Sequence, residues 1–422
     1  MEDKVYCCID LKSFFASVEC VERKLDPMKV NLVVADVERS DGAICLAISP
    51  AMKALGVKNR CRINDIPSGI EYLVARPKMK LYMDKSAEIY SIYLDYISPD
   101  DIHIYSIDEC FIDLTDYVKI YGQTAYGLSK TLTEEVYKRT GIRATVGLGT
   151  NMFLAKIALD ITAKHAEDFT GYLDENLFKK TIWHHRPITD VWNVGKGTAK
   201  RLEKYGIFDL YGIAHADEKM LYKEFGVNAE LLIDHANGIE PCTIADIRAY
   251  KTKSNSLSVG QVLFSDYSID DAFTVLKEMT DTLIFELVEK ELVSGGVSIY
   301  IGYSDSTEKA VGGSARFTGY TSSYKTIMNK VSELYYKFAS PSLKVRRLNV
   351  SLNDVIKEEF CTYDLFSDVT SQEKEKTLYK TVAKIKDKFG KNAIYKGISL
   401  GEKATQRERN KLIGGHRSGE DE

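Results

Sequence analysis

The chain has 422 residues, of which 44% are hydrophobic and 28% are charged, and its formal net charge at pH 7 is −4. This length predicts about two to four domains, and this composition is typical of a globular protein with real cores. No run of about 18 apolar residues occurs, and the N-terminus lacks the order of a secretory signal. We therefore expect a cytoplasmic protein that does not cross a membrane. The small negative charge excludes a uniformly basic surface but not local basic patches.

The eight cysteines form no CxxC pair, and the seven histidines do not cluster. In a cytoplasmic protein, cysteines in this pattern are typical of small buried hydrophobic side chains. We therefore expect neither a redox role nor a zinc site for them.

Residues 1–114 alternate predicted strands and helices. The apolar run from Val5 to Ile9 predicts a strand that ends at Asp10. Further along, the sequence DIHIYSIDECFIDL predicts two short strands with Asp108 and Glu109 at or near the tip of their hairpin. The other elements expected up to residue 165 are strands at 30–37, 42–49 and 142–149, and helices at 13–24, 49–57, 81–97, 122–139 and 151–165. This order predicts a mixed sheet backed by helices.

The composition changes near residue 184, where short helices are expected to flank the turn Gly195, Lys196 and Gly197. Small residues in such a turn allow the backbone to approach another molecule closely. The basic, Ser-rich stretch at 244–261 predicts a tether between two domains. The region that follows, to residue 357, has the pattern strand, helix, strand, strand, helix, strand, which resembles a split βαβ arrangement. Beyond Lys357 we expect an exposed, basic tail.

Asp10, Asp108 and Glu109 are the strongest candidates for chemistry. If the sheet brings the first strand beside the hairpin, three carboxylates meet and repel one another unless divalent cations neutralise them. Oxygen ligands of this kind favour Mg²⁺ or Mn²⁺, and two such ions can clamp the oxygens of an in-line phosphoryl displacement. Adjacent strand residues face opposite ways, so Asp108 and Glu109 can share a site only if the chain turns there. A cap or turn role is the alternative for each aspartate alone.

Four motifs occur in order along the chain: CIDLKSFFASVE, SIDECFIDL, VGLGTNMFLAKIALD and the Gly-Lys-Gly turn. Together they resemble the Y-family DNA polymerases, the lesion-bypass enzymes of the UmuC/DinB type, over nearly the whole chain. The resemblance implies an α+β multidomain fold with the architecture of a right hand. It also implies template-directed addition of dNTPs to a primer, with low fidelity and a role in the SOS response to DNA damage.

The resemblance divides the chain into five parts. They are a palm of mixed sheet and helices at 1–28 and 80–165, small fingers at 29–79, a helical thumb with a helix-hairpin-helix at 166–245, a DNA-binding little finger at 246–357, and a C-terminal tail at 358–422.

Carried over residue by residue, the resemblance makes Asp10 and Asp108 the two metal-bridging aspartates and Glu109 the third carboxylate. It gives the backbone carbonyl of Leu11 the place of a further ligand to two Mg²⁺ ions. Lys156, in the helix after the third motif, is expected to support these carboxylates, and the alternative is a solvated helix face.

For the nucleotide, the resemblance makes Phe15 the steric gate that excludes the 2′-hydroxyl of a ribonucleotide, with Phe14 beside it against the sugar and triphosphate. A place in the hydrophobic core is the alternative, above all for Phe14. Lys53 and Lys164 are expected to face the triphosphate. Pro50 departs from several relatives, which have a Tyr that hydrogen-bonds a phosphate there, and proline has neither a hydroxyl nor a backbone donor.

For DNA, the turn at 195–197 resembles a helix-hairpin-helix, whose backbone amides meet a phosphate without reading bases. In the last domain Arg316, Lys344, Arg346 and Arg347 lie on predicted strands, where alternate residues could line a groove. Such contacts bring salt-dependent, sequence-tolerant affinity. A charged surface strand is the alternative.

In the tail, the sequence TYDLF at 362–366 resembles the short motif with which bacterial polymerases dock on the sliding clamp, with Leu365 and Phe366 as anchors. Thr362 departs from the usual Gln. The resemblance leaves open whether a recombinase or accessory subunits also bind. Two rival functions are a non-catalytic DNA-binding accessory protein that docks on the clamp, and a nucleotide cyclase with a related palm.

Overall fold

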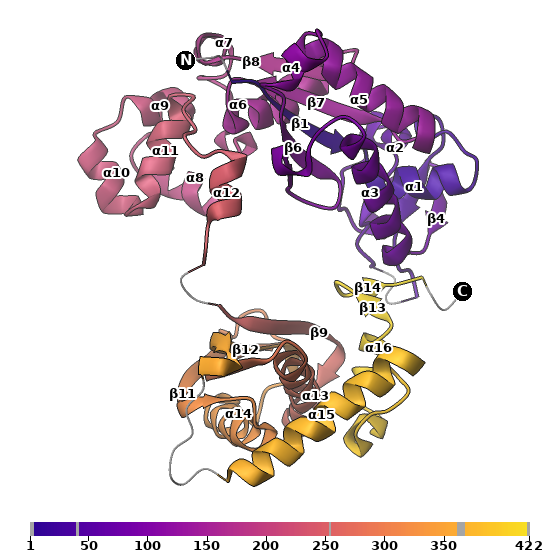
Figure 1. Cartoon of the computed structure of the whole chain (residues 1–422), viewed down its shortest axis with the longest axis vertical. Coiled ribbons are helices and arrows are strands. Elements are labelled where there is room, and N and C mark those ends of the chain that lie inside the picture. Colours follow the sequence, from indigo (N-terminus) through magenta and orange to yellow (C-terminus); the bar gives the residue numbers. More distant parts are fainter. Residues whose placement is uncertain (1–3, 39–41, 253–254, 361–367, 420–422) are drawn as a thin grey trace. The chain divides into compact units, whose positions relative to one another are not determined.

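The computed structural model describes residues 4–38, 42–252, 255–360 and 368–419. The chain folds as two compact units, Met1–Tyr250 and Lys251–Glu422 (Figure 1). Within these described residues, no helix is both long enough and apolar enough to span a membrane. Each unit combines a sheet with helices, as the sequence predicts.

The first unit contains a five-stranded sheet in the order β5-β6-β1-β7-β8. Its strands are β1 (Tyr6–Leu11), β5 (Ile102–Ile104), β6 (Glu109–Asp113), β7 (Ala144–Gly149) and β8 (Thr170–Leu173). Four of these strands come from the region predicted as the palm, but β8 lies beyond the boundary predicted at residue 165, which is therefore placed too early. β1 lies between β6 and β7 and is antiparallel to both. The mixed sheet predicted from the sequence is thus confirmed, because β8 pairs with β7 in parallel.

The two faces of β1 have different surroundings because alternate residues of a strand face opposite ways. Cys7 and Ile9 belong to a core cluster formed with α1 (Phe14–Glu22), α3 (Met79–Leu94) and α5 (Ala125–Thr140). Tyr6 and Cys8 belong to a second cluster, with residues of α6 (Met152–Ile157). By this alternation Asp10 lies on the α6 face of the sheet.

The helix α6 presses closely on β7 because glycines face it. A Cβ atom on Gly147 would lie 2.0 Å from the carbonyl oxygen of Ala155, and one on Gly149 would lie 2.3 Å from the nitrogen of that residue. The helix predicted at 151–165 is therefore packed against the sheet, but it changes character after Ile157. A π-helical turn at Ala158–Thr162 and a 3₁₀ turn at Ala163–His165 follow.

The region predicted as the fingers contains a small sheet in the order β3-β2-β4, with the strands β2 (Leu32–Val34), β3 (Ala47–Ile48) and β4 (Leu73–Ala75). The short helix α2 (Pro50–Ala54) follows β3, with Pro50 at its first position and Ser49 as N-cap. The hydroxyl of Ser49 accepts hydrogen bonds from the backbone N–H groups of Met52 and Leu32. The strand predicted at 42–49 is shorter than expected.

The remaining helices of the first unit come mostly from the region predicted as the thumb, where Phe178, Leu202, Leu221 and Leu232 share a core. They are α4 (Tyr117–Ile120), α7 (Glu175–Thr181), α8 (Lys196–Glu203), α9 (Leu210–Ala214), α10 (Glu218–Phe225), α11 (Asn228–Ala236) and α12 (Ile244–Ala249). Arg248 of α12 pairs with Asp100. The boundary predicted at residue 246 therefore falls inside α12, which belongs to the first unit and not to the tether.

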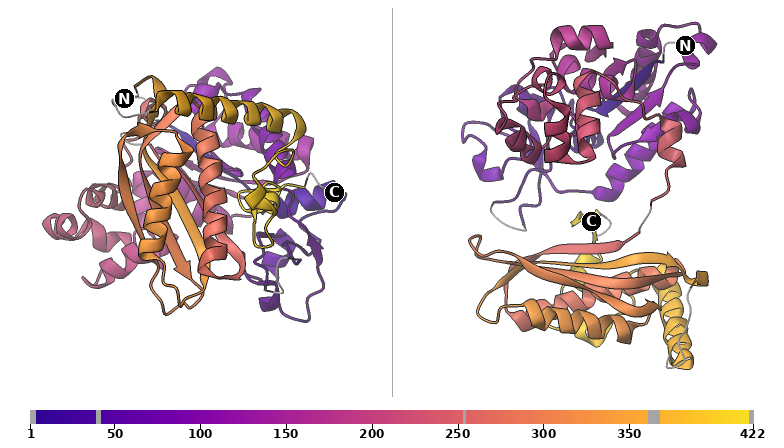
Figure 2. Two further views of the ribbon diagram at one scale, coloured as in Figure 1. Left: turned by 90° about the horizontal axis from the view of Figure 1, so that it is seen from below. Right: turned by 90° about the vertical axis from the view of Figure 1, so that its left-hand side faces the viewer.

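The second unit has the predicted order strand, helix, strand, strand, helix, strand. Its elements are β9 (Leu257–Tyr267), α13 (Ile269–Glu289), β10 (Leu292–Tyr303), β11 (Val311–Thr321), α14 (Tyr324–Phe338) and β12 (Val345–Lys357). The strands form an antiparallel sheet in the order β11-β10-β12-β9. Figure 2 shows α13 and α14 on one face of this sheet. The split βαβ prediction is confirmed.

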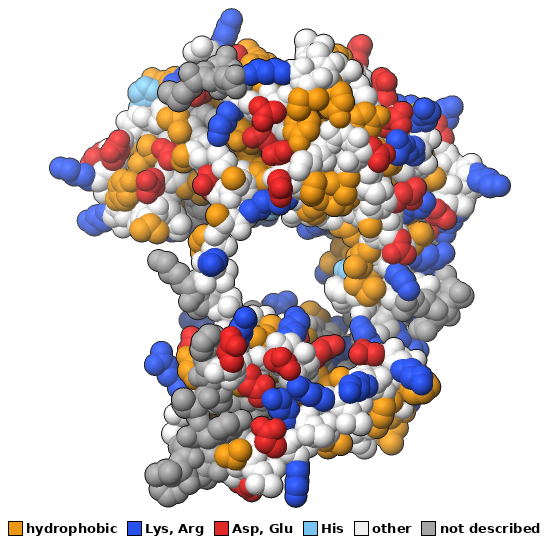
Figure 3. All heavy atoms as spheres, in the orientation of Figure 1, with side chains coloured by type: hydrophobic (Ala, Val, Ile, Leu, Met, Phe, Trp, Pro, Cys, Tyr) orange, Lys and Arg blue, Asp and Glu red, His pale blue; other side chains and the backbone are white. Residues whose placement is uncertain are grey.

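The prediction of an exposed tail is wrong for the part of it that the structure describes. Residues 368–419 contain α15 (Val369–Phe389), α16 (Gln406–Arg409), β13 (Leu412–Ile413) and β14 (His416–Arg417). Tyr379 of α15 is 5% exposed and donates a hydrogen bond to Asp281 of α13. The backbone N–H groups of Thr405 and Gln406 donate to the buried carboxylate of Glu278, also on α13. Basic side chains are frequent over the α15 side of the unit (Figure 3).

Candidate active site

The three predicted acidic residues meet at one end of the β1-β6 pair. Asp10 lies directly opposite Glu109 in the ladder, so the two side chains share the α6 face. Asp108 lies in a bend just before β6, and its carbonyl accepts a hydrogen bond of 2.8 Å from the N–H of Leu11. The hydroxyl of Ser106 donates to Oδ1 of Asp108 at 2.7 Å. The turn that Asp108 and Glu109 need in order to share a site is therefore present.

The charges at this site are not balanced. Burial raises the pKa of Asp10 to about 7, and the negative charges of Asp108 and Glu109 add to this effect. The positive charge of Lys156 works in the opposite direction. Carboxylates with a raised pKa in such a cluster are stabilised in their ionised form by a bound cation.

Lys156 is the main cation beside the acidic cluster. Its ammonium lies 2.7 Å from Oε1 of Glu109 and 3.1 Å from Oδ2 of Asp160, and 9% of its side chain is exposed. Burial disfavours the charged form of Lys156, but Asp160, Cys8 and Glu109 outweigh this and raise its pKa. These contacts agree with the prediction that Lys156 supports the carboxylates. They do not agree with the alternative, in which Lys156 lies on a solvated helix face.

The oxygen donors suit a hard divalent cation by their chemistry, because carboxylates and a backbone carbonyl are the ligands that Mg²⁺ prefers. Among the described residues, however, no group of three or more His, Cys, Asp or Glu side chains is already gathered around a metal position. Glu109 is turned toward Lys156 and accepts a hydrogen bond of 3.2 Å from the thiol of Cys8. A cation at this place would compete with Lys156 for the carboxylate of Glu109.

The two phenylalanines that follow the first strand differ in environment. Phe14 is 2% exposed within the palm core, so its ring offers no surface to a nucleotide, and the core interpretation is the one that fits. Phe15 is only partly buried and stacks on Tyr82, with ring centroids 4.5 Å apart. The hydroxyl of Tyr82 donates to Oε1 of the buried Glu19 at 2.8 Å. Phe15 is therefore held by a ring that is itself fixed by a hydrogen bond.

The basic residues proposed for the triphosphate come from two elements. Lys53 is on α2, and its charge interacts with those of Asp10, Lys164 and Asp108. Lys164 is on the 3₁₀ turn after α6, with its ammonium 4.0 Å from Oδ1 of Asp160 and 64% of its side chain exposed. Lys164 thus lies beside Asp160, which also pairs with Lys156, and Lys53 is close enough to the acidic residues for their charges to interact.

Sequence reasoning missed Lys12, which follows directly after the end of β1. Burial lowers the pKa of Lys12, and the neighbouring charges of Lys53 and Arg143 lower it further, against the effect of Asp10. The backbone N–H of Lys12 donates to the carbonyl of Arg143 at 2.8 Å, which joins the two residues. The sequence DLKSFF carries the only local signal, a cation between the first acid and the phenylalanines.

The turn at 195–197 follows a short 3₁₀ turn and forms the start of α8. Gly195 is the N-cap of α8, and Lys196 and Gly197 form its first turn. A 3₁₀ turn at Ile188–Asp190 precedes it. A Cβ atom on Gly195 or Gly197 would meet no atom within 4 Å, so this helix start is open at the surface.

The three arginines predicted to bind DNA lie in two different environments in the second unit. Arg316 is paired with Gly296 and Arg347 with Gly302, which places both on the same face of the sheet, opposite to the buried Val297 and Ile301. Arg346 lies at an irregularity in β12, and its guanidinium is 3.3 Å from Asp266. Lys344 precedes β12 and is exposed.

The same alternation places Tyr300 on the open face with Arg316 and Arg347. Arg316 and Arg347 therefore share an open face of the sheet, whereas Arg346 pairs with Asp266. The clamp-binding anchors Leu365 and Phe366 lie outside the described residues.

Comparison with known proteins places this arrangement in a family. The model of the impB/mucB/samB family matches residues 9–160, and the model of that family's C-terminal domain matches residues 254–365. The chain is 29% identical to DNA polymerase IV 2 of Bacillus subtilis (strain 168) over 422 residues, which cover 99% of each chain. It is also 29% identical to DNA polymerase IV 2 of Halalkalibacterium halodurans over 420 residues, or 98% of this chain and 99% of the relative.

Among solved structures, the Y-family DNA polymerase chimera Dbh-Dpo4(243-245)-Dbh superposes with a TM-score of 0.64 and 21% sequence identity. The match covers 84% of this chain and 99% of the chimera. At this identity the likeness concerns the fold. Since the family models together match more than half of the chain, it belongs to the impB/mucB/samB family and has the fold of a Y-family DNA polymerase.

Proposed function

We propose that this protein is a DNA-directed DNA polymerase of the lesion-bypass type, which transfers nucleotides from dNTPs to a primer with low fidelity in the SOS response to DNA damage. The observation that carries the proposal is the meeting of Asp10, Asp108 and Glu109 at one end of the β1-β6 pair in a chain of this family. The polymerase names of its relatives support the same activity.

In this proposal Asp10, Asp108, Glu109 and the carbonyl of Leu11 hold two Mg²⁺ ions, or Mn²⁺ in their place. When bound, such a pair of ions stabilises the attacking and leaving oxygens of phosphoryl transfer. Lys156 keeps Glu109 in place through its 2.7 Å contact. Catalysis then requires positioning and charge neutralisation, and no Cys or His nucleophile.

The other proposed roles follow from where the residues lie. Phe15 closes the nucleotide pocket on the side of the 2′-carbon and so selects deoxyribonucleotides. Lys53 and Lys164 orient the triphosphate by their charge. The open start of α8 and the face with Arg316 and Arg347 hold the backbone of primer-template DNA, which gives salt-dependent affinity. Leu365 and Phe366 dock the chain on the sliding clamp.

A primer-extension assay with Mg²⁺ and a defined template tests this function. We expect extension by the wild type and none by Asp108→Ala, whereas Asp116→Ala, which removes an exposed acid further along the same chain, should extend like the wild type. Extension that persists in Asp108→Ala would refute the metal role. A wild type that binds DNA but extends no primer with Mg²⁺ or Mn²⁺ would favour the non-catalytic accessory protein. A template with an abasic site tests lesion bypass.

A further inference from the structure

A cavity lies beside Pro50, the residue that departs from the tyrosine of several relatives. The cavity has a volume of about 320 Å³, and Lys12, Pro50, Tyr137 and Arg143 are among the residues that line it. Pro50 begins α2 and offers neither a hydroxyl nor a backbone donor to a ligand. The polar groups that border the space beside Pro50 include the cationic side chains of Lys12, Lys24 and Arg143.

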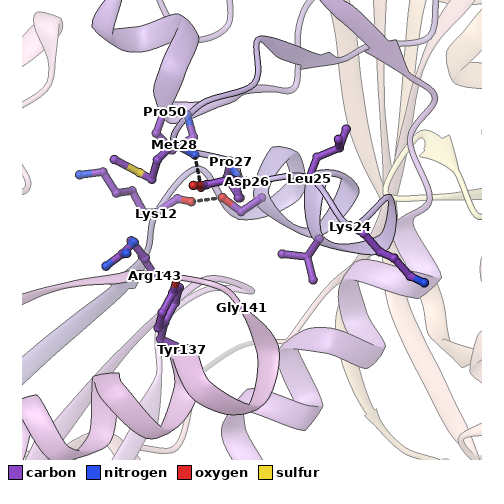
Figure 4. A pocket seen from close by; sticks show the side chains of 12 residues that line it. Lys12, Lys24, Leu25, Asp26, Pro27, Met28, Pro50, Tyr137, Gly141 and Arg143 are labelled. Carbon is purple, nitrogen blue, oxygen red and sulfur yellow. Dashed lines mark hydrogen bonds between the residues drawn. The ribbon is translucent and has the colours of Figure 1, made fainter.

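Two of these cations extend to the same side. Figure 4 shows the side chains of Lys12 and Arg143 pointing in one direction, away from Lys24, which lines the other part of the cavity. The ammonium of Lys12 lies 3.7 Å from the centre of the Phe169 ring, and the guanidinium of Arg143 lies 4.3 Å from that of Tyr137. Aromatic rings thus hold both groups without neutralising them.

Within the described part of the chain, no carboxylate lies within ion-pair distance of Lys12, Arg143 or Lys53. The one acidic residue that lines the cavity, Asp26, accepts a hydrogen bond from the N–H of Met28 and lies 3.8 Å from Lys29. Like charges that are partly buried together repel one another, and a bound anion removes that repulsion. The positive charges of Lys12, Arg143 and Lys53 consequently favour the binding of a multiply charged anion.

We propose that Lys12 and Arg143 contact the polyphosphate of the incoming nucleotide in the space beside Pro50, where they replace the phosphate contact that tyrosine provides in several relatives. This inference rests on the proposed function. Lys12 is two residues after Asp10 in the chain, and its backbone N–H donates to the carbonyl of Arg143 at 2.8 Å. These two cations, which line the cavity, therefore lie at the ends of the paired strands β1 and β7, on the side of the pair that carries Asp10.

Kinetics of single-nucleotide incorporation test the proposal. In Lys12→Met we expect the KM for dNTP to rise about 10-fold, because a charge-assisted contact to phosphate is lost. The KM for pyrophosphate in the reverse reaction should rise by a similar factor, since pyrophosphate lacks the base and sugar. The dissociation constant for primer-template DNA should stay unchanged. Lys12→Arg should restore most of the affinity for both ligands.

The matched control is Lys24→Met, which removes the same charge from the same cavity on the side that Lys12 and Arg143 do not face. It should leave the KM for dNTP and for pyrophosphate at the wild-type values. An unchanged thermal unfolding curve for Lys12→Met shows that the folded state is intact.

A calorimetric titration with Mg²⁺-tripolyphosphate separates this inference from the polymerase function. Weaker binding to Lys12→Met than to the wild type supports the inference even if no primer is extended, in which case only the proposed function fails. Tripolyphosphate binding and KM values within about 2-fold of the wild type overturn the inference while polymerase activity stands. Loss of DNA affinity at constant KM also overturns it, because the cations would then hold DNA.

Discussion

Lys156 on α6 and Glu109 on β6 form an ion pair with 2.7 Å between Nζ and Oε1, and both side chains are almost fully buried. The pair lies on the face of the sheet to which Asp10 also points. Lys156 therefore supplies one positive charge to a site with three acidic residues, one of which is Glu109. Because Gly147 and Gly149 allow α6 to approach β7, the helix is close enough for this contact.

We expect Lys156→Met to destabilise the protein by about 3–5 kcal/mol in the absence of divalent metal, because it leaves buried carboxylates without their cation. Urea unfolding measures this loss. Lys130→Met is the control, since Lys130 pairs with Asp168 at the surface and such a pair contributes about 0–1 kcal/mol. Equal losses in the two variants would contradict the role of Lys156.

Phe15→Ala should admit ribonucleotides, because the ring that stacks on Tyr82 would no longer fill the space near the sugar. We expect the ratio of kcat/KM for dNTP to that for the matching ribonucleotide to fall by about 10-fold or more. Tyr82→Phe is the control, since it keeps the stacked ring and removes only the hydrogen bond to Glu19. It should lose about 1–3 kcal/mol of stability and keep sugar discrimination. Unchanged discrimination in Phe15→Ala would remove Phe15 from the gate.

Asp10 predicts a pH dependence of stability. Its pKa is about 7 in the folded chain and about 4 in an unfolded one. Between these values the folded chain binds more protons, so the contribution of Asp10 to stability falls as pH rises and is lowest above pH 7.

Without divalent metal, Asp10→Asn should therefore be more stable than the wild type at pH 8, and the gain should be about 3 kcal/mol smaller at pH 5. Chemical denaturation at the two pH values measures this difference, with Asp116→Asn as an exposed control. Mg²⁺ should raise the wild-type stability more at pH 8 than at pH 5, because it binds the ionised carboxylate. A gain that is equal at both pH values would show that Asp10 titrates normally.

Within the second unit, Glu278 of α13 holds residues 405–409, because its carboxylate accepts hydrogen bonds from the N–H groups of Thr405 and Gln406. Glu278→Met leaves these donors unsatisfied and should accelerate hydrogen exchange at residues 405–409 by about 10-fold or more. Glu286→Met is the control, because Glu286 lies on the same helix and pairs with the exposed Lys290. Equal exchange in wild type and Glu278→Met would mean that other contacts hold the segment.

Clamp docking is tested by replacing both Leu365 and Phe366 with Ala. We expect the purified sliding clamp to capture the wild type and to lose the double variant, because short docking motifs bind mainly through a few apolar anchors. Lys374→Ala, just inside α15, should be captured like the wild type. Capture of the double variant at full yield would assign the interaction to another surface.

The sequence by itself determined the local elements. The apolar run that ends in Asp10, the hairpin that carries Asp108 and Glu109, and the strand and helix order of the second unit were all predictable. Their signals lie within a few residues of one another: apolar alternation, polar turns and helical spacing. The resemblance to a known family rested on the same short motifs.

Only the tertiary structure decided which neighbours those elements have. Phe14 and Phe15 are adjacent in sequence, yet one is buried in the core and the other stacks at its edge. Composition predicted a charged tail at residues 368–419. Its contacts with α13, which include the buried Tyr379, the N–H of Thr405 and the ammonium of Lys396, depend on tertiary structure that composition does not reveal. Lys12 and Arg143 are more than a hundred residues apart, and only the pairing of β1 with β7 brings them together. Long-range pairing depends on the whole fold, and local patterns carry no record of it.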